Sequence, residues 1–194
     1  LEEPQATPNL AFVKTPLWRQ TDADTQGGFA ELLEHLANQV MEFELPPALA
    51  DMLEWHRTIM EADIAASFEG EYKHGQDRLS ASLREQIERG RKVLAVDYRQ
   101  ALALIPLLNA GFEELFDRFD AILTPAVQGT APLWLASTGN PMFCTLWTFC
   151  GMPALSLPLL QGENGLPIGV QLVGKRGNDA RLLRTANWLM ATLQ

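Results

Sequence analysis

The chain has 194 residues, 47% of them hydrophobic, which is too much apolar content for a disordered tail. Its formal net charge of -9, with Lys and Arg scattered singly, excludes a phosphate backbone as a direct ligand. No apolar run approaches the roughly 18 residues that span a bilayer, and no leader pattern opens the chain, so we expect a cytoplasmic protein without a membrane partner. Because the first residue is Leu1 and not Met, we expect the chain to have been cut from a longer protein.

The first fifty residues predict a strand, a helix and a second strand. The apolar run 10–13 is stopped by Pro16, as expected of a buried strand. Capping side chains at 22–25 precede apolar residues at helical spacing, namely Phe29, Leu32, Leu33, Leu36 and Val40. Residues 41–45 alternate apolar and acidic side chains, which predicts a half-buried strand. Two strands joined by a helix imply a parallel pair with a right-handed crossover.

A helical insertion is predicted next, over about 47–119. Two long helices with apolar faces flank a loosened segment at 70–77 and a short charged helix over 79–90. Within the charged helix, Glu85 and Arg89 have the spacing of an ion pair across one helical turn.

The sheet resumes after the insertion. The expected elements are a strand over 121–124, an apolar helix over 140–150 closed by Gly151, a hairpin of strands over 154–160 and 168–173, and a last helix from Asn178 or Asp179. The predicted fold class is therefore α/β. It is a single domain of residues 1–194, with a mixed sheet of about five strands, flanking helices and the helical insertion.

Reactive groups are scarce in this sequence. None of the five serines stands in a Gly-x-Ser-x-Gly turn, and Ser156, which alternates with two leucines, is expected to be a buried hydroxyl bonded within the sheet. No phosphate-binding loop or metal-ligand spacing occurs, so neither a cofactor nor a metal is expected. We interpret Cys144 and Cys150 as buried small hydrophobic residues, and His35 and His56 as structural histidines. From the residues alone, this is an acidic α/β domain without a visible active site.

Four stretches nevertheless follow one another in a specific order: Asp120-Ala-Ile-Leu-Thr-Pro125, the pair Thr138-Gly139, Gly151-Met-Pro-Ala154 with Pro158, and Gly165-Leu-Pro-Ile-Gly-Val-Gln-Leu-Val-Gly174. This succession resembles the C-terminal part of the amidase signature family. The resemblance implies hydrolysis of carboxylic amides, or ammonia transfer from them, by a Ser nucleophile, a second Ser held by a cis peptide bond, and a Lys.

The family places all three catalytic groups N-terminal to the residues present here, and this chain has no Ser-Ser pair. No catalytic residue is therefore expected in it. Thr148 stands where many family members have Asn, which suggests a subfamily difference.

By the same resemblance, substrate-binding residues are expected in the wall of the pocket. Thr124 and Pro125, with the loop that follows, and Phe143 and Trp147 of the apolar helix would line the acyl side of a small amide substrate. For the two aromatic residues, simple core packing is the alternative interpretation.

Three functions stay open at this point. The chain can be the C-terminal section of an amidase, inactive without the missing N-terminal amidase section. It can be a catalytically empty binding or assembly domain that stands alone, or the C-terminal part of a tRNA-dependent amidotransferase A subunit. If half of a shared sheet is absent, an apolar face or strand edge is exposed, so a homo-oligomer is expected.

Overall fold

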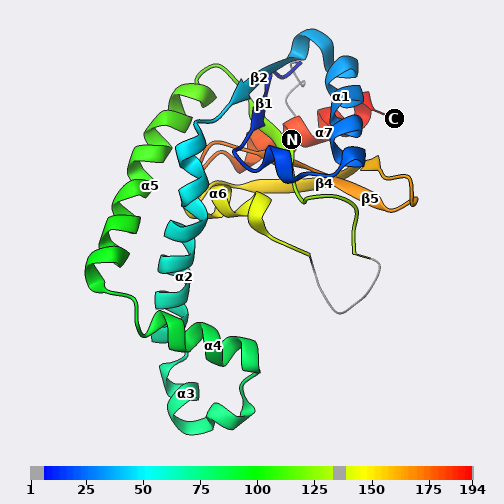
Figure 1. Cartoon of the computed structure of the whole chain (residues 1–194). Coiled ribbons are helices and arrows are strands. Elements are labelled where there is room, and N and C mark those ends of the chain that lie inside the picture. The colour runs from blue at the N-terminus through cyan, green and yellow to red at the C-terminus, as the bar shows by residue number, and fades with distance from the viewer. Residues whose placement is uncertain (1–6, 133–138, 194) are drawn as a thin grey trace. The chain divides into compact units, whose positions relative to one another are not determined.

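The computed structural model describes residues 7–132 and 139–193 and divides into two compact units (Figure 1). One unit comprises Leu1–Ala50 and Asn109–Gln194 and contains the sheet, and the other comprises Asp51–Leu108 and is helical. Thr138 of the resemblance motif lies outside the described residues. None of the helices in the described ranges combines the length and apolar content that crossing a bilayer needs.

The sheet has five strands in the order β2-β1-β3-β5-β4. Strand β1 (Leu10–Lys14) pairs in parallel with β2 (Val40–Glu44) and with β3 (Ala121–Pro125). Strand β5 (Pro167–Val173) pairs antiparallel with β3 and with β4 (Ala154–Gln161). The predicted mixed sheet, with its parallel first pair and its hairpin, is confirmed.

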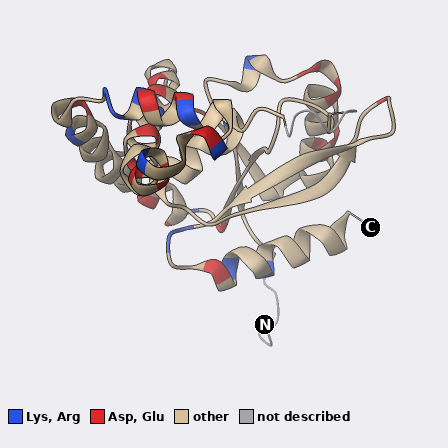
Figure 2. Ribbon diagram, turned by 90° about the horizontal axis from the view of Figure 1, so that it is seen from below, with Lys and Arg blue, Asp and Glu red and all other residues tan. Residues whose placement is uncertain are grey.

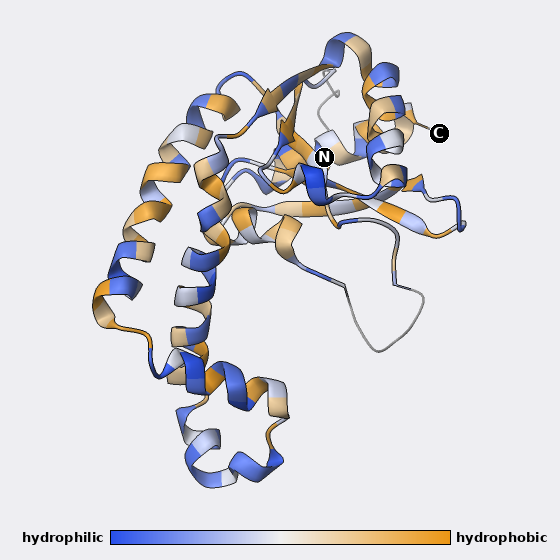
Figure 3. Cartoon of the chain, in the orientation of Figure 1, coloured by the Kyte–Doolittle hydropathy of each residue, from blue (hydrophilic) through white to orange (hydrophobic). Residues whose placement is uncertain are grey.

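Helices cover both faces of the sheet. The helices α1 (Ala23–Leu36) and α7 (Asp179–Thr192) pack on one face, where their leucines join a core cluster with Leu10, Phe12, Leu123, Val170 and Leu172. The helix α6 (Met142–Cys150) contacts the other face, because Gln171 projects opposite to its cluster neighbours and bonds to Cys144. Figure 3 shows the central strands as predominantly hydrophobic.

The ends of these helices follow the predicted capping pattern in part. The carboxylate of Asp22 accepts a hydrogen bond of 2.8 Å from the amide of Thr25 and so caps α1. Gly151 closes α6 in a left-handed conformation with φ of 65°, as predicted. Asn178 stands at the N-cap of α7, but its side chain makes no capping bond.

The two edges of the sheet differ in charge. Edge strand β2 carries Glu42 and Glu44, and the first of these pairs with Lys14 at 2.5 Å. Edge strand β4 reads Ala-Leu-Ser-Leu-Pro-Leu-Leu-Gln and has no charged residue, and in Figure 2 the strands of this hairpin are tan, with acidic colour only at the turn. Natural sheets commonly protect their edges with charge, proline or bulges, and β4 carries Pro158 and a bulge between Leu157 and Leu160.

The helical unit is formed by α2 (Met52–Ser67), α3 (Glu69–Gly75), α4 (Ala81–Gly90) and the first turns of α5 (Ala95–Phe116). Short 3-10 turns lie here at Gln76–Arg78, and in the rest of the chain at Trp18–Gln20, Ala37–Gln39 and Pro47–Asp51, the last ending at the unit boundary.

The loosened segment predicted at 70–77 is wrong, because α3 and a 3-10 turn occupy it. Gly70 suggested a break, but Glu69 and Lys73 pair at 2.7 Å across one turn of α3 and stabilise the helix.

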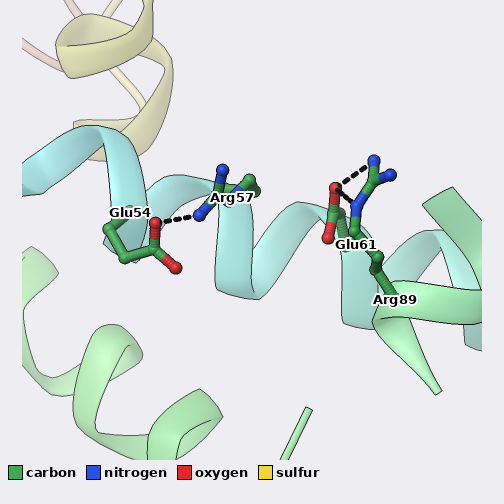
Figure 4. Close-up of polar contacts among 4 residues, drawn as sticks. All are labelled: Glu54, Arg57, Glu61 and Arg89. Atoms are coloured by element: carbon green, nitrogen blue, oxygen red, sulfur yellow. Dashed lines mark hydrogen bonds and ion pairs between the residues drawn. The ribbon is translucent and has the colours of Figure 1, made fainter. Parts of the chain in front are cut away.

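The ion pair predicted between Glu85 and Arg89 is also wrong. Arg89 instead donates from Nε and Nη2 to Glu61 of α2, at 2.8 and 2.7 Å (Figure 4). Glu61 is buried, whereas Glu85 is exposed to water. A buried carboxylate without a partner is strongly destabilising. The Arg89 guanidinium therefore pairs with the buried Glu61 of α2 and not with Glu85 on its own helix.

Candidate functional site

A depression of about 370 Å³ lies at the carboxyl end of β3, where the chain leaves the sheet. It is formed by the loop after β3 and by parts of β4 and β5. Its lining residues are all uncharged: Ala126, Val127, Ala131, Pro132, Ser156, Pro158, Pro167 and Gly169. The hydroxyl of Ser156 is the single protic side chain among them. Small-molecule sites are mostly apolar with a few placed polar groups, and this depression has that composition.

The loop over 126–132 is held to the sheet by its own backbone. The amide of Ala126 donates to the carbonyl of Gly169 at 3.0 Å, and the amide of Ala131 donates to the carbonyl of Pro167 at 3.3 Å. Figure 1 shows this loop leaving β3 beside the β4–β5 hairpin. Since both ends of the loop are bonded to β5, the wall of the depression is already formed in this chain.

Two further regions fix the middle of the same loop. The carbonyl of Gln128 accepts from the amide of Asp22 at 2.9 Å and from the hydroxyl of Thr25 at 3.3 Å, both at the start of α1. The hydroxyl of Thr130 accepts from the side chain of Asn164, in the β4–β5 turn, at 3.0 Å. Segments far apart in the sequence therefore hold one wall.

A row of polar side chains crosses the sheet, and one of them, Ser156, lines the depression. Thr124, Gln171 and Ser156 are register partners on the adjacent strands β3, β5 and β4. The hydroxyl of Thr124 donates to the carbonyl of Val13 at 3.1 Å, and the amide of Gln171 donates to the sulfur of Cys144 at 3.4 Å. The Cys144 thiol in turn donates to the carbonyl of Ala126 at 3.4 Å, which connects α6 to the loop.

The four predicted substrate-binding residues are all buried, and none of them lines the depression. Thr124 and Pro125 end β3 directly before the wall, so their backbone positions the loop. Phe143 and Trp147 lie in the core on α6, and the Trp147 ring meets Phe112 edge to face at 5.4 Å. In this chain the geometry favours the core interpretation of the two aromatic residues.

Ser156 was expected to be a buried hydroxyl, and this is wrong because its side chain is exposed. It alternates with leucines that pack under α1 and α7, so it points to the other face, which α6 covers only in part. The lining residue Ala126 carries no chemical signature of a site. A glycine inside an apolar strand does signal a close approach, and Gly169 was the available signal.

The two cysteines differ in burial. Cys150 is buried as predicted, and burial raises the pKa of its thiol to about 12, although Arg176 opposes this shift. Cys144 is only half-buried and hydrogen-bonded, so the prediction of burial is wrong for it.

The two histidines predicted to be structural differ in exposure. His35 is exposed, and His56 is half-buried with its pKa lowered by burial. In the described part of the chain, no three His, Cys, Asp or Glu side chains are grouped as metal ligands.

A family model described as Amidase matches residues 1–183. The chain belongs to the amidase signature family. Among curated proteins, this amidase-family chain is 26% identical over 186 residues to 2-amino-5-chloromuconic acid deaminase of Comamonas testosteroni, covering 87% of the chain and 40% of the deaminase. It is also 34% identical over 96 residues to the A subunit of the glutamyl-tRNA(Gln) amidotransferase of Agathobacter rectalis, covering 46% of the chain and 19% of that protein.

Solved structures agree with the family assignment. A crystal structure of an amidase superposes with a TM-score of 0.78 at 27% identity, and the match covers 96% of this chain and 46% of that one. The amidase-family chain thus spans less than half the length of the relatives that it matches.

Proposed function

We propose that this chain is the C-terminal section of an amidase that hydrolyses carboxylic amides to an acid and ammonia or an amine. The observation that supports this most directly is the wall formed by 126–132, which is bonded in place around an uncharged depression although the sequence holds no Ser-Ser pair. Such a chain supplies core and pocket wall, while the catalytic groups come from the remaining N-terminal section. Alone, it is inactive.

In this function, Thr124 and Pro125 position the wall through the backbone at the end of β3. Phe143 and Trp147 support the pocket from the core, where both are almost completely buried. Their packing keeps α6, and with it the Cys144 contact to Ala126, at a fixed place. The proposal therefore assigns the aromatic residues to support and the loop to contact with a small amide substrate.

The test is an ammonia-release assay with acetamide and benzamide. We expect no turnover by this chain alone and turnover by the longer parent protein. Mixing the chain with a separately expressed N-terminal section is the complementation arm, and we expect it to restore part of the activity. Turnover by the isolated chain would contradict the proposal. A natural start codon immediately upstream of Leu1 would instead favour a catalytically empty domain that stands alone.

The similarity to an amidotransferase A subunit over 96 residues favours a second candidate. In that function, the ammonia released from an amide serves a transfer reaction and a partner protein holds the RNA, so the acidic charge of this chain is no obstacle. Comparing glutamine with acetamide as substrates of the parent separates the two functions. Glutamine-specific turnover that depends on a partner protein identifies the amidotransferase.

We also propose a cytoplasmic location and self-association of the isolated chain through β4. The support for self-association is the edge strand without charge. Light scattering should detect a homo-oligomer, and Ala154→Lys on β4 should shift it toward monomer while Met41→Lys on β2 should not. A monodisperse monomer of the unaltered chain contradicts self-association.

A further inference from the structure

Glycine at position 169 leaves room between two other residues that line the depression, Ser156 and Ala126. A Cβ atom at this position would lie 2.8 Å from the hydroxyl oxygen of Ser156 and 2.9 Å from the Cβ of Ala126, closer than such atoms pack. Gly169 is not among the glycines with positive φ, so its backbone does not require glycine. Steric room is therefore what glycine provides at this position.

The chemistry of the lining limits what the depression accepts. Six of its eight lining residues have purely aliphatic side chains, and the other two are Gly169 and Ser156. A carboxylate placed there would lose hydration without gaining a cationic partner, which is strongly unfavourable. An uncharged group loses little on transfer, and the exposed Ser156 hydroxyl can hydrogen-bond to one polar atom of it.

The size of the depression also points to a compact ligand. At about 370 Å³ it lies at the low end of the roughly 300–1,000 Å³ typical of small-molecule sites. Its wall is held by the bonds from Ala126 and Ala131 to β5, so ligand binding does not have to order the loop.

We propose that the depression is the acyl subsite of the amidase, and that Gly169 and Ser156 make it selective for compact, uncharged acyl groups. This inference rests on the proposed function, since it names the substrate class of the same site. Gly169 sets the depth of the subsite. Ser156 supplies its one directed hydrogen bond.

The experiment measures kcat/KM of the longer parent protein for acetamide, benzamide and 4-carboxybenzamide. We expect benzamide to exceed 4-carboxybenzamide by about 10-fold or more, because only the latter carries a charge into the subsite. Gly169→Ala should lower the benzamide-to-acetamide ratio by about 10-fold, the usual effect of one methyl group in a tight pocket. Gly27→Ala is the matched control, since nothing lies within 4 Å of a Cβ there, and it should leave the ratio unchanged.

Ala131→Leu narrows the same depression from an exposed loop position, so it tests the subsite even where Gly169→Ala fails to fold. It should also lower the benzamide-to-acetamide ratio. Two results with an active parent would overturn the subsite and leave the amidase function intact. One is a benzamide-to-acetamide ratio of kcat/KM that neither substitution changes. The other is hydrolysis of 4-carboxybenzamide as fast as benzamide. A parent that releases ammonia from no amide overturns both.

Discussion

The crossing of α2 and α4 gives a sharp test of the packing in the helical unit, through the substitution Gly90→Ala. A Cβ atom at position 90 would lie 1.9 Å from the carbonyl oxygen of Glu61, 2.5 Å from its carbonyl carbon and 2.9 Å from the Cβ of Ala65. Two of these atoms belong to the backbone of α2, so no side-chain rotation relieves the clash. The helices must separate, and that also disturbs the bond between Arg89 and Glu61.

The magnitude follows from two opposing effects. Overpacking a tight contact costs about 1–3 kcal/mol, and a backbone clash belongs at the upper end of that range. Replacing glycine inside a helix returns at most about 1 kcal/mol. We therefore expect a net loss of about 2 kcal/mol, or a Tm lower by about 4–8 °C for a chain of this size.

The assay is thermal unfolding followed by far-ultraviolet circular dichroism. Gly70→Ala in α3 is the matched control, because nothing lies within 4 Å of a Cβ there, and it should raise the Tm slightly. If Gly90→Ala is as stable as the unaltered chain, α2 and α4 do not cross this closely.

Three further outcomes are expected. In urea titrations, Asp22→Ala should lower the free energy of unfolding by about 1 kcal/mol, because α1 loses its cap. Asn178→Ala should have a smaller effect, because the Asn178 side chain makes no capping bond to α7. Equal effects of the two substitutions would contradict the cap assignment. Burial lowers the pKa of His56, so the unfolded chain binds a proton there more readily, and the free energy of unfolding should fall as pH drops below about 6.5. In His56→Gln this dependence of the free energy of unfolding on pH should be weaker. An unchanged pH dependence would refute the role of His56. Burial raises the pKa of Cys150 to about 12 from an ordinary 9.0, so its contribution to stability is full below pH 9 and is lost as pH rises toward 12. At pH 8, a thiol reagent should label Cys144 well before Cys150, as followed by mass spectrometry. The reverse order of labelling would contradict the burial of Cys150.

The sheet was predictable because its strands are short apolar runs bounded by Gly and Pro. Pro125 and Gly151 mark the ends of β3 and α6 in the sequence, and the structure places both ends there. The hairpin was predictable for the same reason, from the Gly-rich turn between β4 and β5. Gly and Pro end strands and helices through the local backbone conformation, which nearby residues determine.

Contacts between distant segments were not predictable in the same way. Arg89 has a suitable partner at one helical turn, yet the burial of Glu61 decides the pairing, and burial depends on the tertiary fold. Ser156 was misplaced because alternation along a strand gives the face of a residue and not what covers that face. The depression itself is formed by small apolar residues, which resemble ordinary core until their spatial arrangement is known.

The anchoring of the wall also bears on how this chain folds. The start of α1 is bonded to residues 103 and 139 positions later, through the Thr25 hydroxyl to Gln128 and the Glu163 amide to Asp24. Contacts between residues so far apart in the sequence form late in folding, because the chain entropy lost in forming them is large. During synthesis, the first helix can form locally, but its N-terminus gains these partners only after the β4–β5 turn has left the ribosome. The wall of the depression is thus among the last parts of the sheet unit to become ordered.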